Sequence, residues 1–386
     1  MRRLVFALLL ILPACVSADA AVTCGKPHKP PCPTTTTPTP TTTTPPPTTT
    51  TPAPTTTPPP PNDRRIAVLL INFSDDVRQP WTTGFIDSLY DGPPKSLADF
   101  YSVSSFGQLT VTSDTFGWFT IANPVAPCTV GTVADQADAA AIAAGVDLSL
   151  YTNKAYVWPQ NNATGACRST GEMPGDQSWV ALQTTCTPTA CAARSSLWHE
   201  FGHNLALNHA SAYNCNGVVY SQTCTASEYG DSFDVMGCCS TPLISNLGRL
   251  KVGWIPPAQV VTVTQSSTIT VTGMNDPASL VYRVSLGDGN FMYIENRAQR
   301  TIYENGNGES WPGGMLLFRV APDYTVHLAN PPDAFPYSYL LDGSPESNTN
   351  PQTRGLPVGG SFTANGVTFT NLAFDGINNT VEVAIT

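Results

Sequence analysis

One stretch constrains this chain more than any other: His199-Glu200-Phe201-Gly202-His203. On a helix, residues four apart lie on the same face, so His199 and His203 can present two imidazoles to one ion. Glu200 lies one step round the helix, close enough to hold a water molecule at that ion. Two ligands and a general base on one helical turn are the content of the HExxH zinc motif. The sequence therefore predicts a zinc site on a helix.

The alternative is a surface or core helix that happens to carry histidines. The chain has only five histidines, and three of them, including His209, fall within residues 199–209. A carboxylate at the position of a base and a third ligand close by both favour metal binding.

The N-terminus is typical of an export signal. A positive pair, Arg2-Arg3, precedes an apolar run at 4–12 and small residues, so residues 1–18 are predicted to be a signal peptide. Lipid attachment at Cys15 is a second interpretation, because residues 12–15 look like a bacterial lipobox, although proline is unusual there.

Cysteine usage agrees with export. Eleven cysteines fall to ten when Cys15 leaves with the signal, an even number suited to disulfides in an oxidising compartment. Sequons at Asn72, Asn162 and Asn378 are glycan acceptors in a host that glycosylates, although Asn72 lies close to a buried strand. We expect a secreted glycoprotein that is extracellular or associated with a cell wall.

The charge balance excludes some partners. The formal net charge is −10 with only 18 lysines and arginines, and no basic patch is visible, so no nucleic-acid partner is expected. The apolar run of the signal is too short to span a bilayer, and no other segment is predicted to cross one.

Composition divides the rest of the chain. Residues 19–33 form a short segment with cysteines, and residues 34–61 are Thr and Pro apart from Ala53. The second segment has no apolar surface to bury and many fixed φ angles, so an extended, semi-rigid linker is predicted.

Residues 62–255 have the pattern of a mixed α/β domain. An apolar run at 66–73 predicts a buried strand, and 96–105 and 133–146 read as helices. The helix with the zinc motif is predicted to begin with Ser195 or Ser196 as its N-cap. Alternating helices and strands predict an α/β (α+β) catalytic domain with a mixed sheet and an active-site helix.

Residues 256–386 change to short alternating strands. Seven are predicted, at 260–264, 268–272, 280–286, 291–295, 315–320, 367–370 and 381–385, and Gly287-Asp288-Gly289 signals a hairpin. This part is predicted to be an all-β sandwich.

At this point the sequence resembles a known family. Residues 199–209 are similar to the metzincin zinc signature HExxHxxGxxH, and residues 234–237 look like the Met-turn that follows it. Further stretches across most of 63–255 resemble gametolysin-type (autolysin) metalloproteases: Phe100-Tyr101, Ser105-Phe106-Gly107-Gln108-Leu109, Gly117-Trp118-Phe119, Asn208-His209-Ala210 and Glu228-Tyr229-Gly230-Asp231.

The resemblance implies a role for each matching residue. His199, His203 and His209 would ligate one catalytic Zn²⁺, whose open fourth position would hold water. Glu200 would act as the general base on that water, and Met236 would form the floor under the histidines without binding metal. Some metzincins place a tyrosine two residues after this methionine, but Cys238 stands there instead.

One position departs from the family pattern. Ala206 stands where metzincins have the glycine that lets the chain leave the helix sharply. Alanine adopts the left-handed conformation only at a cost of about 1–2 kcal/mol. The alternative to His209 as third ligand is a downstream carboxylate, for which Glu228 is the best candidate.

Cys24-Gly25-Lys26-Pro27-His28 resembles the cysteine switch of matrix metalloproteases, in which a propeptide thiolate keeps the zinc enzyme latent. Thr23 and His28 stand where that family has Arg and Asp, so a Cys24–Cys32 disulfide loop is the alternative to a latency thiol.

Two functions follow from these patterns. The first is a secreted, monomeric zinc endopeptidase acting on extracellular or cell-wall proteins and glycoproteins, and the resemblance to gametolysins implies targets rich in proline or hydroxyproline. The second is a non-catalytic, extracellular wall-binding protein with a vestigial metal site, against which the intact Glu200 argues. Ca²⁺ has no support, because no EF-hand or RTX pattern is present.

Overall fold

The computed structural model describes residues 63–187, 191, 194–237, 242–297, 301–303, 314–324, 338–345 and 355–386. The predicted signal peptide (1–18), the segment 19–33 with Cys24 and the linker (34–61) lie outside the described residues, and so does Cys238. Within the described part of the chain, no helix has the length and hydrophobicity that a membrane crossing requires.

The first part of the fold is a five-stranded sheet in the order β2-β1-β3-β5-β4. Four strands run parallel, and β4 pairs antiparallel with β5, so the predicted mixed sheet is confirmed. The strands are β1 (Asp63–Asn72), β2 (Thr110–Thr120), β3 (Asn153–Pro159), β4 (Thr170–Gly171) and β5 (Gln177–Leu182).

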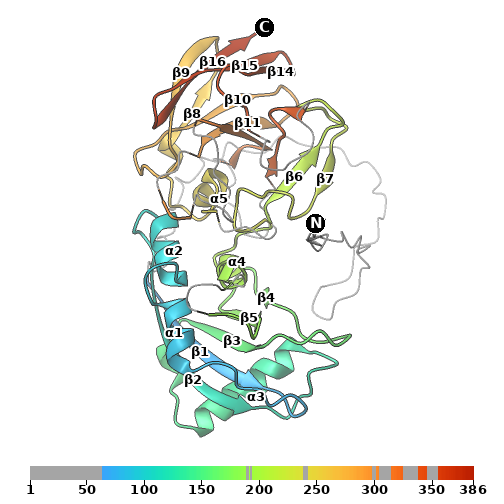
Figure 1. Ribbon diagram of the computed structural model, residues 1–386. Helices are drawn as coiled ribbons and strands as arrows, with labels where there is room; N and C mark the ends of the chain where they lie inside the picture. Colours follow the sequence, from blue (N-terminus) through green and yellow to red (C-terminus); the bar gives the residue numbers. More distant parts are fainter. Residues whose placement is uncertain are drawn as a thin grey trace, which may run out of the picture. The chain divides into compact units, whose positions relative to one another are not determined.

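Helices cover both faces of this sheet (Figure 1). Alternate residues of β1 point to opposite faces. Ile66 and its neighbours two and four residues on pack with α1 (Thr83–Tyr90), α2 (Leu97–Ser104) and α4 (Arg194–Asn204), and the intervening residues pack with α3 (Val130–Ala143). This double coverage explains why the β1 sequence is a continuous apolar run.

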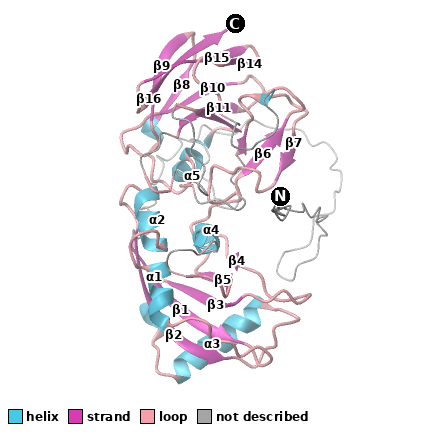
Figure 2. Cartoon of the chain, viewed as in Figure 1, coloured by secondary structure: helices cyan, strands magenta, loops and turns pink. Residues whose placement is uncertain are grey.

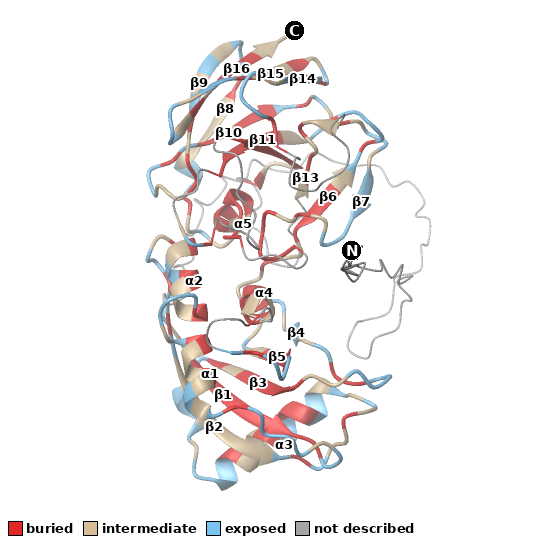
Figure 3. Ribbon diagram, viewed as in Figure 1, coloured by how far each residue is buried: buried red, intermediate tan, exposed pale blue. Residues whose placement is uncertain are grey.

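The helix with the zinc motif, α4, is held by α2. The hydroxyl of Tyr101 on α2 donates a hydrogen bond to the Trp198 carbonyl at 2.5 Å, and the Phe100 ring stacks on the Trp198 ring with centroids 4.4 Å apart. Figure 3 shows α4 as buried along most of its length. The helix begins at Arg194, so Ser195 and Ser196 lie within its first turn and the prediction of either as the N-cap is wrong. The Arg194 N–H donates to the Cys191 carbonyl at 3.2 Å.

The second part is a sandwich of two sheets (Figure 2). One has the order β7-β6-β13-β12-β11-β10-β8 and the other β14-β15-β16-β9. Apolar side chains of both sheets, such as Phe318 of β12 and Phe369 of β15, form one buried cluster, which confirms the predicted sandwich. The strands and short helices are β6 (Ser211–Asn214), β7 (Thr225–Ser227), β8 (Val260–Val263), β9 (Ser267–Thr272), β10 (Val281–Ser285), β11 (Phe291–Asn296), β12 (Leu316–Ala321), β13 (Tyr339–Leu340), β14 (Ser361–Ala364), β15 (Val367–Phe374), β16 (Asn378–Ile385), α5 (Asn246–Lys251), η1 (Leu148–Leu150) and η2 (Pro257–Gln259).

The seven-stranded sheet contains strands from both sides of residue 255. β6 and β7 precede that residue, yet β6 pairs parallel with β13 through Ser211↔Tyr339 and Ala212↔Leu340. The division of the chain into 62–255 and 256–386 stays a prediction.

Three disulfides stabilise loops of the described chain: Cys128–Cys167, Cys186–Cys191 and Cys215–Cys224. The last two join cysteines that are 5 and 9 residues apart and close short loops. The side chain of Asn72 is fully buried at the end of β1 and donates to the Val77 carbonyl at 3.2 Å, so this sequon is not accessible to a glycosyltransferase in the folded chain.

Candidate active site

Three histidines converge at the C-terminal end of α4. One ligand nitrogen from each of His199, His203 and His209 lies within 4.8 Å of the others. The two Nε2 atoms of His199 and His203 are 3.2 Å apart, and the His209 ring centroid lies 4.9 Å from that of His203. Among the described residues, these form the one cluster of histidine, cysteine and carboxylate side chains with the spacing of a metal site.

Each ring is fixed by a hydrogen bond on its other nitrogen. Nδ1 of His199 donates to the Val235 carbonyl at 3.0 Å, and Nδ1 of His203 donates to the Leu207 carbonyl at 2.8 Å. Because a carbonyl oxygen only accepts, both Nδ1 atoms carry the proton and both Nε2 lone pairs are available. This pattern is the one that metal-binding histidines use to fix the tautomer and the ring orientation.

Burial keeps two of these rings neutral. Removal from water lowers the pKa of His199 to about 4 and the pKa of His203 to about 3. Both imidazoles are therefore deprotonated at neutral pH, the form that binds a metal ion. The donor set of three imidazoles fits a transition-metal ion such as zinc.

The third histidine reaches the cluster through the turn that ends α4. The Leu207 N–H donates to the Gly202 carbonyl at 3.0 Å and the Ala206 N–H to the His203 carbonyl at 2.8 Å, as in a Schellman C-cap. Ala206 has φ 70°, so alanine occupies the left-handed position where most helices use glycine. The chain reverses here and brings His209 back to the end of the helix.

Met236 lies directly against the helix. It is 2% exposed, and a Cβ atom added at Gly202 would approach its Sδ to 2.4 Å. The carboxylate of Asp234 accepts hydrogen bonds from the N–H groups of Met236 at 2.9 Å and Ser245 at 2.8 Å, which shapes the turn. The structure thus places Met236 beneath the histidine-bearing turn, where a Met-turn residue is expected.

Glu200 is next to His199 on α4 and is 7% exposed. Burial raises the pKa of its carboxyl group to about 8. A carboxyl group with a pKa close to the working pH can both accept and return a proton, as a general base that later acts as an acid must do.

Two residues, Glu228 and Tyr229, contact the His209 ring in ways that the sequence did not predict. Nδ1 of His209 lies 2.6 Å from Oε1 of Glu228, so Glu228 contacts the His209 ring and is not one of the three convergent residues. Tyr229, with φ 60°, lies over the His209 ring with centroids 3.8 Å apart. Tyr229 lies in one of the stretches that resemble the family, but the sequence predicted no role for it, because its place over His209 depends on the pairing of β6 with β7.

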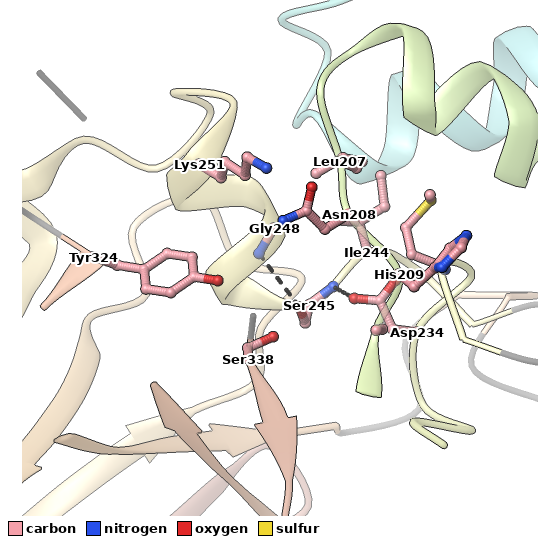
Figure 4. A pocket seen from close by; sticks show the side chains of 12 residues that line it. Leu207, Asn208, His209, Asp234, Ile244, Ser245, Gly248, Lys251, Tyr324 and Ser338 are labelled. Atoms are coloured by element: carbon pink, nitrogen blue, oxygen red, sulfur yellow. Dashed lines mark hydrogen bonds between the residues drawn. The ribbon is translucent and has the colours of Figure 1, made fainter. Parts of the chain in front are cut away.

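A cavity of about 30 Å³ lies behind His209 and Met236 (Figure 4). Lys251, Tyr324 and Ser338 line its other side, and burial lowers the pKa of Lys251 to about 8. A cavity of this size has room for about one water molecule. The segments that follow β12 and precede β13 therefore reach the back of the histidine cluster.

Comparisons with known proteins agree with this geometry. The gametolysin peptidase M11 family model matches residues 86–321, more than half of the 386-residue chain, and the match contains all three histidines, Glu200 and Met236. Comparison with curated protein sequences gave no match.

Three crystal structures of OgpA from Akkermansia muciniphila are similar to this chain at 11% identity. Two are wild-type crystal forms, with TM-scores of 0.33 and 0.32, and cover 67% and 72% of this chain and 88% and 94% of OgpA. The third is catalytically inactive OgpA in complex with an O-glycopeptide (glycodrosocin) substrate, with a TM-score of 0.32 and coverage of 67% and 88%.

The family match confirms the resemblance seen in the sequence. The peptidase family and the convergent histidines together identify a metalloendopeptidase that acts on proteins. This chain therefore belongs to the gametolysin peptidase M11 family.

Proposed function

We propose that this chain is a secreted zinc endopeptidase that hydrolyses peptide bonds of extracellular or cell-wall proteins. The observation that carries the proposal is the convergence of His199, His203 and His209 within 4.8 Å. Three protein ligands with a fourth position left for water or substrate are typical of catalytic zinc, whereas structural zinc has four protein ligands.

When bound, zinc supplies a Lewis acid that polarises a carbonyl oxygen and lowers the pKa of water to about 7. Glu200 takes the proton of the water molecule that attacks the peptide carbonyl carbon. It then delivers that proton to the amine nitrogen as the C–N bond breaks. Its position next to His199 on α4, almost completely buried, suits this double role.

Met236 supports the ligands without binding the ion. Its side chain fills the space beside Gly202 between the two helical histidines, so it holds the position of α4 from below. The Ala210 N–H donates to the Met236 carbonyl at 2.9 Å, which ties the segment after His209 to the same turn.

The sequence and the disulfides support an extracellular location. Cys128–Cys167, Cys186–Cys191 and Cys215–Cys224 require an oxidising compartment, in agreement with the signal pattern at 1–18. We propose proteins and glycoproteins as substrates, including those rich in proline or hydroxyproline because of the family, and a monomer as the working form.

The test is hydrolysis of a denatured, labelled protein by the purified chain, with zinc quantified in the same preparation. Wild type is expected to hold about one zinc and to cleave, and Glu200→Ala is expected to hold zinc without cleaving. Glu382→Ala is the matched control, because Glu382 is an exposed residue of β16. A folded wild type without zinc would contradict the proposal, as would equal cleavage by Glu200→Ala.

A further inference from the structure

We propose that Glu228 is a positioning residue that orients His209 for the metal. The β6–β7 hairpin brings Glu228 into contact with His209. The proposal rests on the proposed function, since it assigns His209 as the third zinc ligand. The sequence offered Glu228 as an alternative zinc ligand, whereas the proposal makes it the hydrogen-bond partner of the zinc ligand His209.

The three histidines differ in what holds them. The Nδ1 atoms of His199 and His203 donate to backbone carbonyls, which no side-chain change removes. The Nδ1 of His209 alone has a side-chain acceptor, Oε1 of Glu228 at 2.6 Å. His209 also follows the end of α4 and lacks the helical frame of the other two. It is therefore the ligand whose orientation depends most on an added contact.

The hairpin explains how residues 19 apart in the chain meet. β6 starts two residues after His209, and β7 pairs with it through Ala212↔Ser227 and Asn214↔Thr225. Cys215 and Cys224 are the next pair in this register and are joined by a disulfide. The closed hairpin returns the chain to the residue that follows β7, which is Glu228.

The residue after Glu228 holds the face of the same ring. Tyr229 packs on His209 with centroids 3.8 Å apart, and its φ of 60° is unusual for a bulky residue. Strain of this kind persists where the surroundings fix it, and it clusters at functional sites. Glu228 at Nδ1 and Tyr229 over the ring face together restrict the orientation of His209, and Nε2 is the nitrogen that the proposal assigns to the metal.

The contact between Glu228 and His209 can be distinguished from one that only stabilises the fold. The Glu228 side chain is 62% exposed, and exposed pairs of this kind add little to folding stability. A partner that orients a metal ligand, in contrast, changes metal affinity by about 10–100-fold when it is removed. We therefore expect Glu228 to affect zinc binding far more than stability.

The experiment measures zinc affinity by chelator competition for wild type, Glu228→Ala, Glu228→Gln and the exposed control Glu382→Ala. Glu228→Ala is expected to bind zinc about 10–100-fold more weakly. Glu228→Gln retains a carbonyl oxygen that accepts from Nδ1 and should recover most of that loss. The Co²⁺-substituted spectrum should shift in Glu228→Ala and not in the control, and the melting temperatures of the metal-free proteins should agree.

Three results would overturn the proposal. One is wild-type zinc affinity in Glu228→Ala, and another is a Glu228→Gln variant as weak as Glu228→Ala. The third is a lower melting temperature of metal-free Glu228→Ala that accounts for its loss of affinity. Failure of the proposed function is recognised separately, because folded wild type and Glu382→Ala would then both lack zinc.

Discussion

The guanidinium group of Arg319 on β12 lies 2.8 Å from the carboxylate of Asp231, measured from Nε to Oδ2. Both side chains are almost completely buried. The second oxygen of Asp231 accepts from the Phe233 N–H at 2.8 Å, so the ion pair fixes the segment that leads into Met236. Arg319 also donates from Nη1 to Glu295 at 2.7 Å. Arg319, a residue of the sandwich, therefore stabilises the segment that leads into Met236.

Arg319→Met should lower the free energy of unfolding by about 3–5 kcal/mol, because it leaves Asp231 and Glu295 as buried anions with one cation fewer. Urea unfolding followed by tryptophan fluorescence measures this change. Arg65→Met is the matched control, since Arg65 pairs with Asp114 at the surface and both side chains are nearly half exposed. Equal midpoints for the two variants would show that the buried pair is not important for stability.

Glu295 gives the fold a specific acid sensitivity. Burial alone would raise the pKa of Glu295, but Arg297 and Arg319 outweigh it and lower the pKa to about 2, from an ordinary 4.5. Because the folded-state pKa is depressed, the stabilisation is complete above about pH 4.5 and is lost as the pH falls toward 2.

Glu295→Gln should therefore melt well below wild type at neutral pH, where the two arginines lose an anionic partner. The difference should shrink as the pH falls from about 5 to about 2.5, because the unfolded wild type binds a proton at Glu295 in this range and the folded protein binds it only near pH 2. Melting temperatures across this range measure the effect, with Glu382→Gln as the exposed control. A difference that does not change with pH would contradict the assignment.

Gly202→Ala tests the contact between the catalytic helix and Met236. The new methyl group would come within 2.4 Å of the Met236 sulfur, which must then move out of its place under the histidines. We expect a loss of about 1–3 kcal/mol in stability and reduced cleavage. Gly131→Ala in α3 is the matched control, because no atom lies within 4 Å of its added Cβ. That variant should gain about 0.5–1 kcal/mol.

Ala206→Gly tests the strain in the turn before His209. Alanine at φ 70° costs about 1–2 kcal/mol, and glycine removes this cost but adds about 0.5–1 kcal/mol of unfolded-chain entropy. The variant should therefore be equally stable or slightly more stable and should retain zinc. The melting temperatures of wild type and Ala206→Gly measure this balance. A clear loss of stability in Ala206→Gly would mean that the Cβ of Ala206 makes contacts that outweigh the strain.

The parts of the site that lie close together in sequence were predictable. The spacing of His199, Glu200 and His203 contains the helical geometry, and the pattern after them led to His209 and Met236. Seven strands of the sandwich, β8 to β12, β15 and β16, were predicted because each has several apolar residues in an extended pattern. Short strands such as β13, with two residues, carry too little pattern to be recognised.

Long-range pairings were not predictable. Arg319 and Asp231 are 88 residues apart, and their contact depends on how β12 packs against the loop before Met236. Glu228 was only the alternative to His209 as third ligand, because its residue type suits zinc, and its place beside Nδ1 of His209 follows from the register of a hairpin. Residue types indicate which chemistry is available, whereas strand register decides which atoms meet.

The pairing of β6 with β13 limits which parts of this protease can be transferred to another protein. A gene fusion that carried residues 62–255 alone would expose the edge of β6 two residues from His209, and exposed edges invite aggregation. A fusion of residues 256–386 alone would expose the partner edge of β13 in the same way. Recombination would therefore yield a working enzyme only when α4 and the C-terminal strands are transferred together.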